Sequence, residues 1–157
     1  MDINSLFKEV ESFEKYLQRK NNSGFVISKY FNRELQISNP ENADLRQLGL
    51  GSASGLYFLV GSDDKVLYIG KATKGNLHAE LWGKLRTPVG DQIPMQYPNT
   101  YWSKMPDLEC ANDLLNGKIS IAVLKIDPPE YSSLFEVYLQ THCYFSGKFP
   151  KLNSQIG

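Results

Sequence analysis

The stretch Ser54-Gly-Leu-Tyr-Phe-Leu-Val60, followed after a short turn by Val66-Leu-Tyr-Ile-Gly-Lys71, decides the fold class of this chain. Both segments are rich in β-branched and aromatic residues, which is typical of strands. The residues between them, Gly61-Ser-Asp-Asp64, are turn formers. The sequence therefore predicts a β-hairpin. Whether Tyr57 and Tyr68 share a face depends on the register of this hairpin, which the turn sets and the sequence alone does not fix.

Three segments after the hairpin also have the pattern of regular secondary structure. Residues 76–85 carry leucines at four-residue spacing, which predicts a helix. Residues 119–126 form an apolar run that is typical of a buried strand. Two prolines, Pro128 and Pro129, then interrupt the chain, and residues 131–145 are expected to form a second helix.

The first 53 residues lie before the hairpin and have a different character. Residues 3–19 carry an apolar stripe at the spacing of an amphipathic helix. Residues 25–37 are mixed, with a strand-like start and a short helix or strand after it. We expect residues 1–53 to form a helical and irregular extension that packs on a core of residues 54–157. A role of the extension in target recognition or dimerisation stays an alternative.

Composition indicates one ordinary globular domain. The 157 residues are 41% hydrophobic and 22% charged. No apolar run is long enough to span a bilayer, and the start lacks the pattern of a secretory signal, so we expect a cytoplasmic protein with no membrane partner. Cys110 and Cys143 stand apart from each other and from any Cys-x-x-Cys pair, which favours reduced thiols over a zinc site or a disulfide framework.

The balance of charge limits how the chain could bind nucleic acid. Seventeen basic and seventeen acidic residues give a net charge of zero, and the pI is near 6.7. Such a balance argues against wrapping of nucleic acid by charge alone. Any basic surface must be local, and the candidates for it are Lys71, Lys74, Lys84, Arg86, Lys148 and Lys151.

The hairpin and two later motifs carry a family resemblance. Gly55-Leu-Tyr57, ten intervening residues and then Tyr68-Ile-Gly70 resemble the paired signature of the GIY-YIG nuclease superfamily, with leucine for isoleucine as the one departure. Glu136 is the only acid between Tyr131 and Pro150, in the helix where that family carries a glutamate. The segment Pro150-Lys-Leu-Asn153 is similar to the family's closing Pro-x-Leu-Asn. The resemblance covers about two thirds of the chain.

The resemblance implies a fold and an activity. The expected fold is α+β, a small three-stranded antiparallel sheet flanked by helices. The expected activity is that of a metal-dependent DNA endonuclease with Mg²⁺ or Mn²⁺ as its cofactor; RNA as a substrate and a homodimer stay open. Glu136 would be the metal ligand, Tyr57 the general base and Tyr68 the residue that orients the water or phosphate. A basic neighbour would have to favour the phenolate. The candidate catalytic residues are Tyr57, Tyr68, Lys71, Lys84, Arg86, Glu136 and Asn153.

The chain departs from the family pattern in the helix after the hairpin. Glu80 stands where an arginine is expected. Sliding the helix by one turn places Lys84 at the arginine position instead, with Arg86 two residues further on. The alternative function is therefore a nucleic-acid-binding or regulatory protein that keeps the fold but cleaves poorly or not at all. Target specificity is expected in the first fifty residues and in the insertion 88–116.

Overall fold

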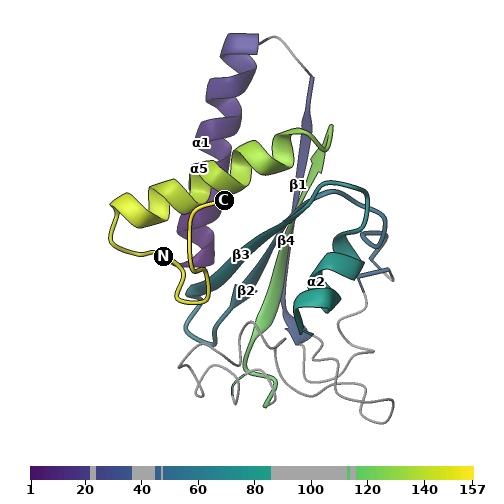
Figure 1. Cartoon of the computed structure of the whole chain (residues 1–157), viewed down its shortest axis with the longest axis vertical. Helices are drawn as coiled ribbons and strands as arrows, with labels where there is room; N and C mark the ends of the chain where they lie inside the picture. The colour runs from purple at the N-terminus through teal and green to yellow at the C-terminus, as the bar shows by residue number, and fades with distance from the viewer. Residues whose placement is uncertain (22–23, 37–44, 47, 86–112, 114–115) are drawn as a thin grey trace.

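The computed structural model describes residues 1–21, 24–36, 45–46, 48–85, 113 and 116–157, and within them it forms an α+β fold (Figure 1). A four-stranded antiparallel sheet has the strand order β1-β4-β2-β3. The strands are β1 (Val26–Gln36), β2 (Gly55–Val60), β3 (Val66–Ala72) and β4 (Ser120–Asp127). The helices are α1 (Ile3–Asn21), α2 (Leu77–Leu85) and α5 (Tyr131–Phe145).

The sheet has one strand more than the three that we expected. β1 comes from the N-terminal extension and pairs antiparallel with β4, from Val26 opposite Asp127 to Phe31 opposite Ala122. Its sequence looked mixed because β1 is an edge strand, where polar residues such as Lys29 are tolerated and even protective. Val26 is 64% exposed. Part of the extension therefore belongs to the sheet itself.

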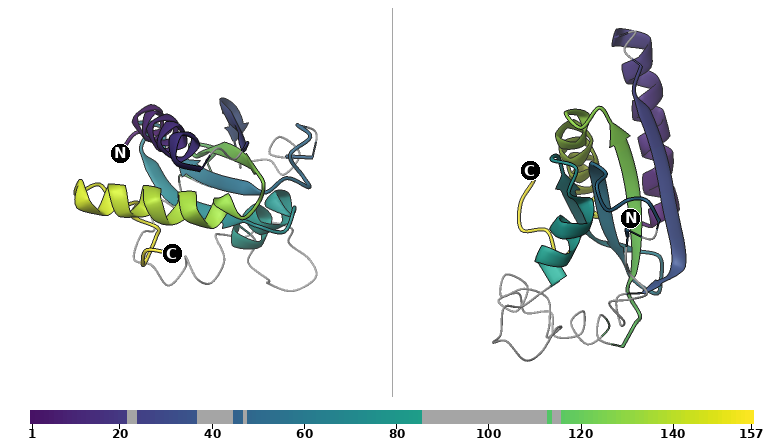
Figure 2. Two further views of the ribbon diagram at one scale, coloured as in Figure 1. Left: turned by 90° about the horizontal axis from the view of Figure 1, so that it is seen from above. Right: turned by 90° about the vertical axis from the view of Figure 1, so that its right-hand side faces the viewer.

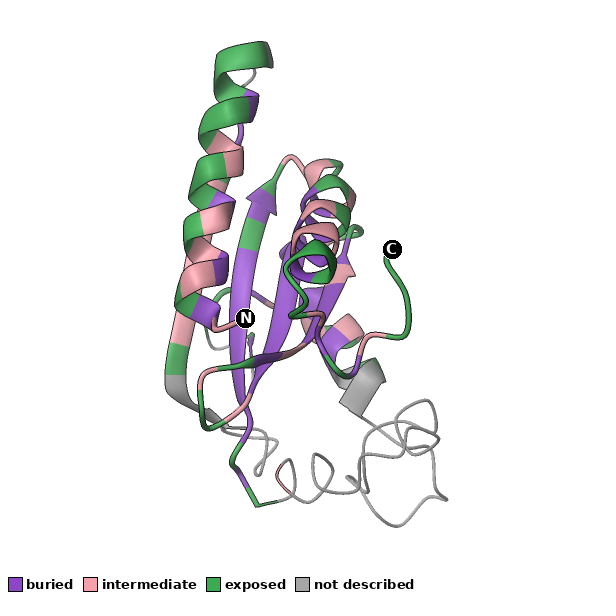
Figure 3. Ribbon diagram, turned by 90° about the vertical axis from the view of Figure 1, so that its left-hand side faces the viewer, coloured by how far each residue is buried: buried purple, intermediate pink, exposed green. Residues whose placement is uncertain are grey.

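Helices cover both faces of the sheet. α1 and α2 lie on opposite sides of it (Figure 2). α5 packs with α1 on one face, where it crosses α1 (Figure 1) and the ring of Tyr138 stacks on that of Phe13 at a centroid distance of 3.8 Å. On the other face, α2 packs with Leu45 and Leu50. β2, at the centre, is therefore buried along its whole length (Figure 3).

The expected helices and the third strand of the core are confirmed within one or two residues at each end. α5 begins at Tyr131, and Glu130 separates it from the two prolines; the peptide bond Asp127–Pro128 is cis. α1 is preceded by Asp2, whose two carboxylate oxygens accept hydrogen bonds from the backbone and the hydroxyl of Ser5. These bonds lower the pKa of Asp2. No helix among the described residues is both long and apolar enough to cross a membrane.

The close approach of β2 to β4 requires a glycine at position 55, the first residue of β2. Its φ is +147°, in the region that residues with a side chain rarely adopt. A Cβ at this position would lie 1.9 Å from the carbonyl oxygen of Leu124. The first glycine of the hairpin motif is therefore needed for strand pairing.

Candidate functional site at strand β3

The two tyrosines of the hairpin share one face of the sheet. Tyr57 lies opposite Gly70 and Leu59 lies opposite Tyr68, so both phenol rings project toward the α2 side. Their ring centroids are 5.9 Å apart and their planes are inclined by 37°. Both side chains are buried, at 1% and 7% exposure.

Gly70 makes room for this pair. A Cβ on Gly70 would lie 2.4 Å from Cζ and 2.6 Å from the hydroxyl oxygen of Tyr57, and 2.7 Å from Cε1 of Tyr68. The two rings therefore lie over the backbone of Gly70. Any side chain at this position would collide with them, so the position must be glycine.

The surroundings of Tyr57 favour the neutral phenol. Burial is the largest cause, and it raises the pKa of Tyr57 far above its ordinary value. The neighbouring Tyr68 and the negative charges of Glu80 and Glu136 raise it further. In the free protein Tyr57 is thus protonated at neutral pH, and a role as general base needs positive charge to approach it.

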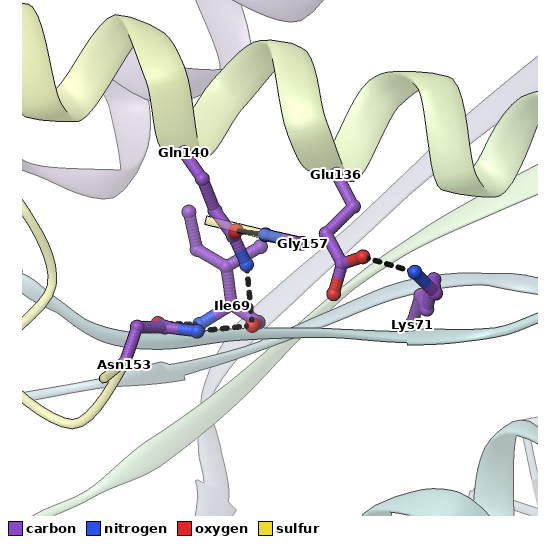
Figure 4. A network of polar contacts seen from close by, with 6 residues as sticks. All are labelled: Ile69, Lys71, Glu136, Gln140, Asn153 and Gly157. Carbon is purple, nitrogen blue, oxygen red and sulfur yellow. Dashed lines mark hydrogen bonds and ion pairs between the residues drawn. The ribbon is translucent and has the colours of Figure 1, made fainter. Parts of the chain in front are cut away.

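Lys71 and Glu136 meet on the opposite face of the sheet. Lys71 follows Gly70, so its side chain projects toward α5. Its Nζ lies 2.6 Å from Oε2 of Glu136, and the two side chains are 35% and 7% exposed (Figure 4). β3 is an edge strand, so the tyrosine pair and the ion pair lie on the two sides of one sheet edge.

Glu136 belongs to a buried polar row on α5. From the sequence alone, Glu136 would be expected on the solvent side of the helix. In the structure Leu134 lies on that side, at 43% exposure, and Glu136 is buried. Ser132, Glu136 and Gln140 are spaced four residues apart and are all buried. The hydroxyl of Ser132 has no hydrogen-bond partner within the described residues. A buried polar group without a partner, such as this hydroxyl, calls for an explanation, and a bound water or ligand is one.

Gln140 is a site residue that the sequence reasoning missed. Its Nε2 lies 3.4 Å from the carbonyl oxygen of Ile69, and its Oε1 accepts a hydrogen bond of 2.6 Å from the backbone N–H of Gly157 (Figure 4). Gln140 thereby links α5 to β3 and to the last residue of the chain. The available signal was its position one helical turn after Glu136.

Asn153 binds the outer edge of β3. Its Oδ1 accepts the backbone N–H of Ile69 at 2.9 Å, and its Nδ2 donates to the carbonyl oxygen of Ile69 at 2.9 Å (Figure 4). The backbone N–H of Leu152 donates to the carbonyl oxygen of Leu67, two residues earlier along β3. Asn153 therefore supplies hydrogen-bond partners to the exposed side of the edge strand at Ile69. This residue lies between Tyr68 and Lys71 along β3.

Replacing Asn153 with leucine should lower the free energy of unfolding by about 1–3 kcal/mol, because both backbone groups of Ile69 lose a close partner. Urea unfolding followed by tryptophan fluorescence measures the loss. Gln155→Leu, an exposed neighbour in the same segment, should change the stability by less than about 0.5 kcal/mol. Equal midpoints for the two variants would contradict this role of Asn153.

The expected cations of α2 cannot be placed in the site. Lys84 lies in α2, but its side chain is outside the described part of the chain, and so is the whole of Arg86. The insertion 88–116 is likewise outside it, apart from residues 113 and 116. Glu80 is described: its Oε1 accepts a hydrogen bond of 3.0 Å from Nδ2 of Asn76, at the start of α2. Glu80, which stands where an arginine was expected, adds negative charge near Tyr57.

Glu136 is the buried carboxylate of this site that could hold a divalent cation. Within the described ranges there is no group of three or more His, Cys, Asp or Glu side chains that could hold a metal ion. Glu136 offers Oε1, since its ion pair with Lys71 uses Oε2. A single carboxylate fits Mg²⁺, which keeps several waters and is commonly held by one or two carboxylates together with substrate phosphates.

Comparison with known proteins leaves the function open. The chain matches no protein-family model, no curated protein and no solved structure. The function must therefore be argued from the geometry around β3.

Proposed function

We propose that this protein is a metal-dependent endonuclease of the GIY-YIG type, which hydrolyses phosphodiester bonds in DNA at the edge strand β3. The observation that carries the proposal is the buried Glu136 carboxylate, with Lys71 as its partner, on one side of the edge strand β3, and a tyrosine pair folded over Gly70 on the other side. The reacting phosphate would lie across this edge, between the two pairs. Burying a carboxylate costs free energy that the ion pair with Lys71 offsets only in part, which makes Glu136 a candidate for a functional role.

In the proposed reaction the oxygen of a water molecule bonds to phosphorus, the bond from phosphorus to the leaving sugar oxygen breaks, and that oxygen takes a proton from a solvent water molecule. Lys71, when it leaves Glu136, neutralises charge on the phosphoryl oxygens. Tyr68 and Tyr57 hold the attacking water by hydrogen bonds. Tyr57 first gives up its own phenolic proton to solvent, once the positive charge of Lys71 and of a bound cation has lowered its pKa, and the phenolate then takes one proton from the attacking water.

Glu136 is the residue that would hold a hydrated Mg²⁺ or Mn²⁺, through a single carboxylate. When bound, such a cation polarises the phosphoryl group and makes its waters more acidic. Asn153 does not need to touch the substrate in this scheme. Its two bonds to Ile69 keep β3 in place between the two halves of the site.

The second candidate is a nucleic-acid-binding protein of the same fold that does not cleave. Two observations favour it: Glu80 adds negative charge near Tyr57, and Lys71 already pairs with one oxygen of the carboxylate that would hold the cation. The two candidates make opposite predictions for the wild-type chain: the first cleaves DNA, and the second binds DNA without cleaving it.

Lys71→Met and Tyr57→Phe should each reduce the rate of plasmid nicking in Mn²⁺ or Mg²⁺ at least tenfold, because each removes a group that acts on the charged reacting centre. Binding of DNA, measured by fluorescence anisotropy with Ca²⁺ in place of the active metal, should change little for Tyr57→Phe. Lys15→Met, an exposed lysine on α1, is the control and should keep its activity. Binding without cleavage in the wild-type chain would favour the second candidate.

A further inference from the structure

The hydroxyl group of Ser132 is buried without a partner. Ser132 is 0% exposed in the first turn of α5, and its Oγ makes no hydrogen bond in the described part of the chain. A serine in a helix often donates to the carbonyl four residues earlier. Here that carbonyl belongs to Pro128, and it accepts the backbone N–H of Tyr131 at 3.3 Å instead. The fold of the free protein therefore makes no use of this hydroxyl.

Ser132 lies one helical turn before Glu136, on the same face of α5. Both residues are buried where the helix packs on the sheet. Side chains four residues apart on a helix are neighbours, with about 6 Å between their Cβ atoms. A small change in side-chain torsion is therefore enough to bring the serine hydroxyl within hydrogen-bond distance of the carboxylate.

The Glu136 carboxylate has Lys71 as its hydrogen-bond donor in the free protein. Nζ of Lys71 lies 2.6 Å from Oε2, and Oε1 points away from this bond (Figure 4). A cation on Oε1 and the ammonium group on Oε2 would repel each other across one carboxylate. The Lys71 side chain is 35% exposed, so it can turn toward solvent or toward a phosphate. Binding of a cation should therefore be coupled to the departure of Lys71.

The departure of Lys71 leaves Oε2 buried and without its donor. A buried polar atom that loses its hydrogen bond is costly, and more so when it is charged. Carboxylates that ligate a metal are in turn held by hydrogen bonds from neighbouring groups, which fix their orientation. The unpaired hydroxyl of Ser132, on the same buried face of α5, is a donor that can take over this bond.

We propose that Ser132 is the positioning residue for Glu136: its hydroxyl donates a hydrogen bond to Oε2 when Lys71 turns away, and it thereby holds Oε1 toward the cation. The inference rests on the proposed function, because it concerns the same carboxylate. It gives a role to a residue that the hairpin signature does not include, and it accounts for a buried hydroxyl that packing leaves unpaired.

The test measures binding of Mn²⁺ to the full chain by electron paramagnetic resonance, in the absence of DNA. Ser132→Ala should weaken the binding at least about tenfold, the usual loss when a group that holds a metal ligand is removed. Ser133→Ala is the matched control on the same turn of α5. Its side chain is turned about 100° away from that of Ser132, so this variant should keep the wild-type affinity.

Stability separates this role from a structural one. Because the hydroxyl is unpaired in the free protein, the metal-free Ser132→Ala variant should keep the wild-type urea midpoint or exceed it slightly. A clear fall in the midpoint would show that the hydroxyl stabilises the fold through a partner of its own, and it would overturn the proposal.

The Mn²⁺ measurement distinguishes failure of this inference from failure of the proposed function. Equal affinities of Ser132→Ala and the wild-type chain would overturn the role of Ser132, and cleavage by that wild-type chain would keep the endonuclease. The expected loss of affinity in a chain that never cleaves would keep the role of Ser132 and remove the endonuclease function. A wild-type chain that binds no Mn²⁺ would overturn both.

Discussion

The substitution Glu136→Gln should reduce cleavage of plasmid DNA at least a thousandfold while the protein stays folded. Glutamine keeps the shape of the side chain and can still accept a hydrogen bond from Lys71 through its amide oxygen. It removes the negative charge that the proposed cation requires. The loss should therefore appear in the initial rate of nicking, with a small change in thermal midpoint.

A matched control is available on the same helix. Glu130 is exposed at the start of α5 and makes no side-chain hydrogen bond to cap the helix, so Glu130→Gln should keep the wild-type rate. If Glu136→Gln and Glu130→Gln cleave equally fast, Glu136 has no part in the chemistry. If Glu136→Gln unfolds instead, the buried ion pair is structural, and the midpoint measurement shows it.

The substitution Gly70→Ala should have the largest effect on the architecture of the site. The new methyl group would lie 2.4 Å from the ring of Tyr57 and 2.7 Å from that of Tyr68, so both rings must move. Overpacking of this kind costs about 1–3 kcal/mol, which is a large fraction of the stability of a small domain. The rings would also leave the positions that hold the proposed water, so cleavage should be lost as well.

Gly83→Ala provides the contrast for this prediction. A Cβ at Gly83, in α2, meets no atom of the described residues within 4 Å, and alanine is the better helix former by about 1 kcal/mol. Gly83→Ala should therefore raise the urea midpoint where Gly70→Ala lowers it. A Gly70→Ala protein with wild-type stability would show that the two rings can rearrange freely, and would contradict the fixed pair described above.

The sequence predicted the hairpin and the main helices because each has an unambiguous local pattern. α5 begins at Tyr131 as expected, shortly after the two prolines that interrupt the chain. The shared face of the tyrosines could not be predicted. It depends on the register, and the pairing shifts between Leu59 and Val60, where Val60 lies opposite Val66. An irregularity of this kind changes which residues face each side and leaves little trace in the sequence.

The extra strand and the inner polar row escaped prediction for tertiary reasons. β1 is an edge strand, where local pattern is weak because only part of its surface is buried. The burial of Glu136 and Gln140 depends on how α5 is rotated over β3, and the sheet decides this rotation. The departure at Glu80 was visible in the sequence, but its closeness to Tyr57 required the structure.

The central claim is that the side chains around strand β3, together with a divalent cation, hydrolyse phosphodiester bonds. The most direct measurement incubates the purified wild-type chain with supercoiled plasmid in Mg²⁺ or Mn²⁺, with and without excess chelator, and resolves the products on a gel. The account predicts open-circular or linear DNA that appears only with the cation and is lost in Glu136→Gln. Intact plasmid in both metals, and no cleavage of single-stranded DNA or RNA by a protein that binds them, would contradict it.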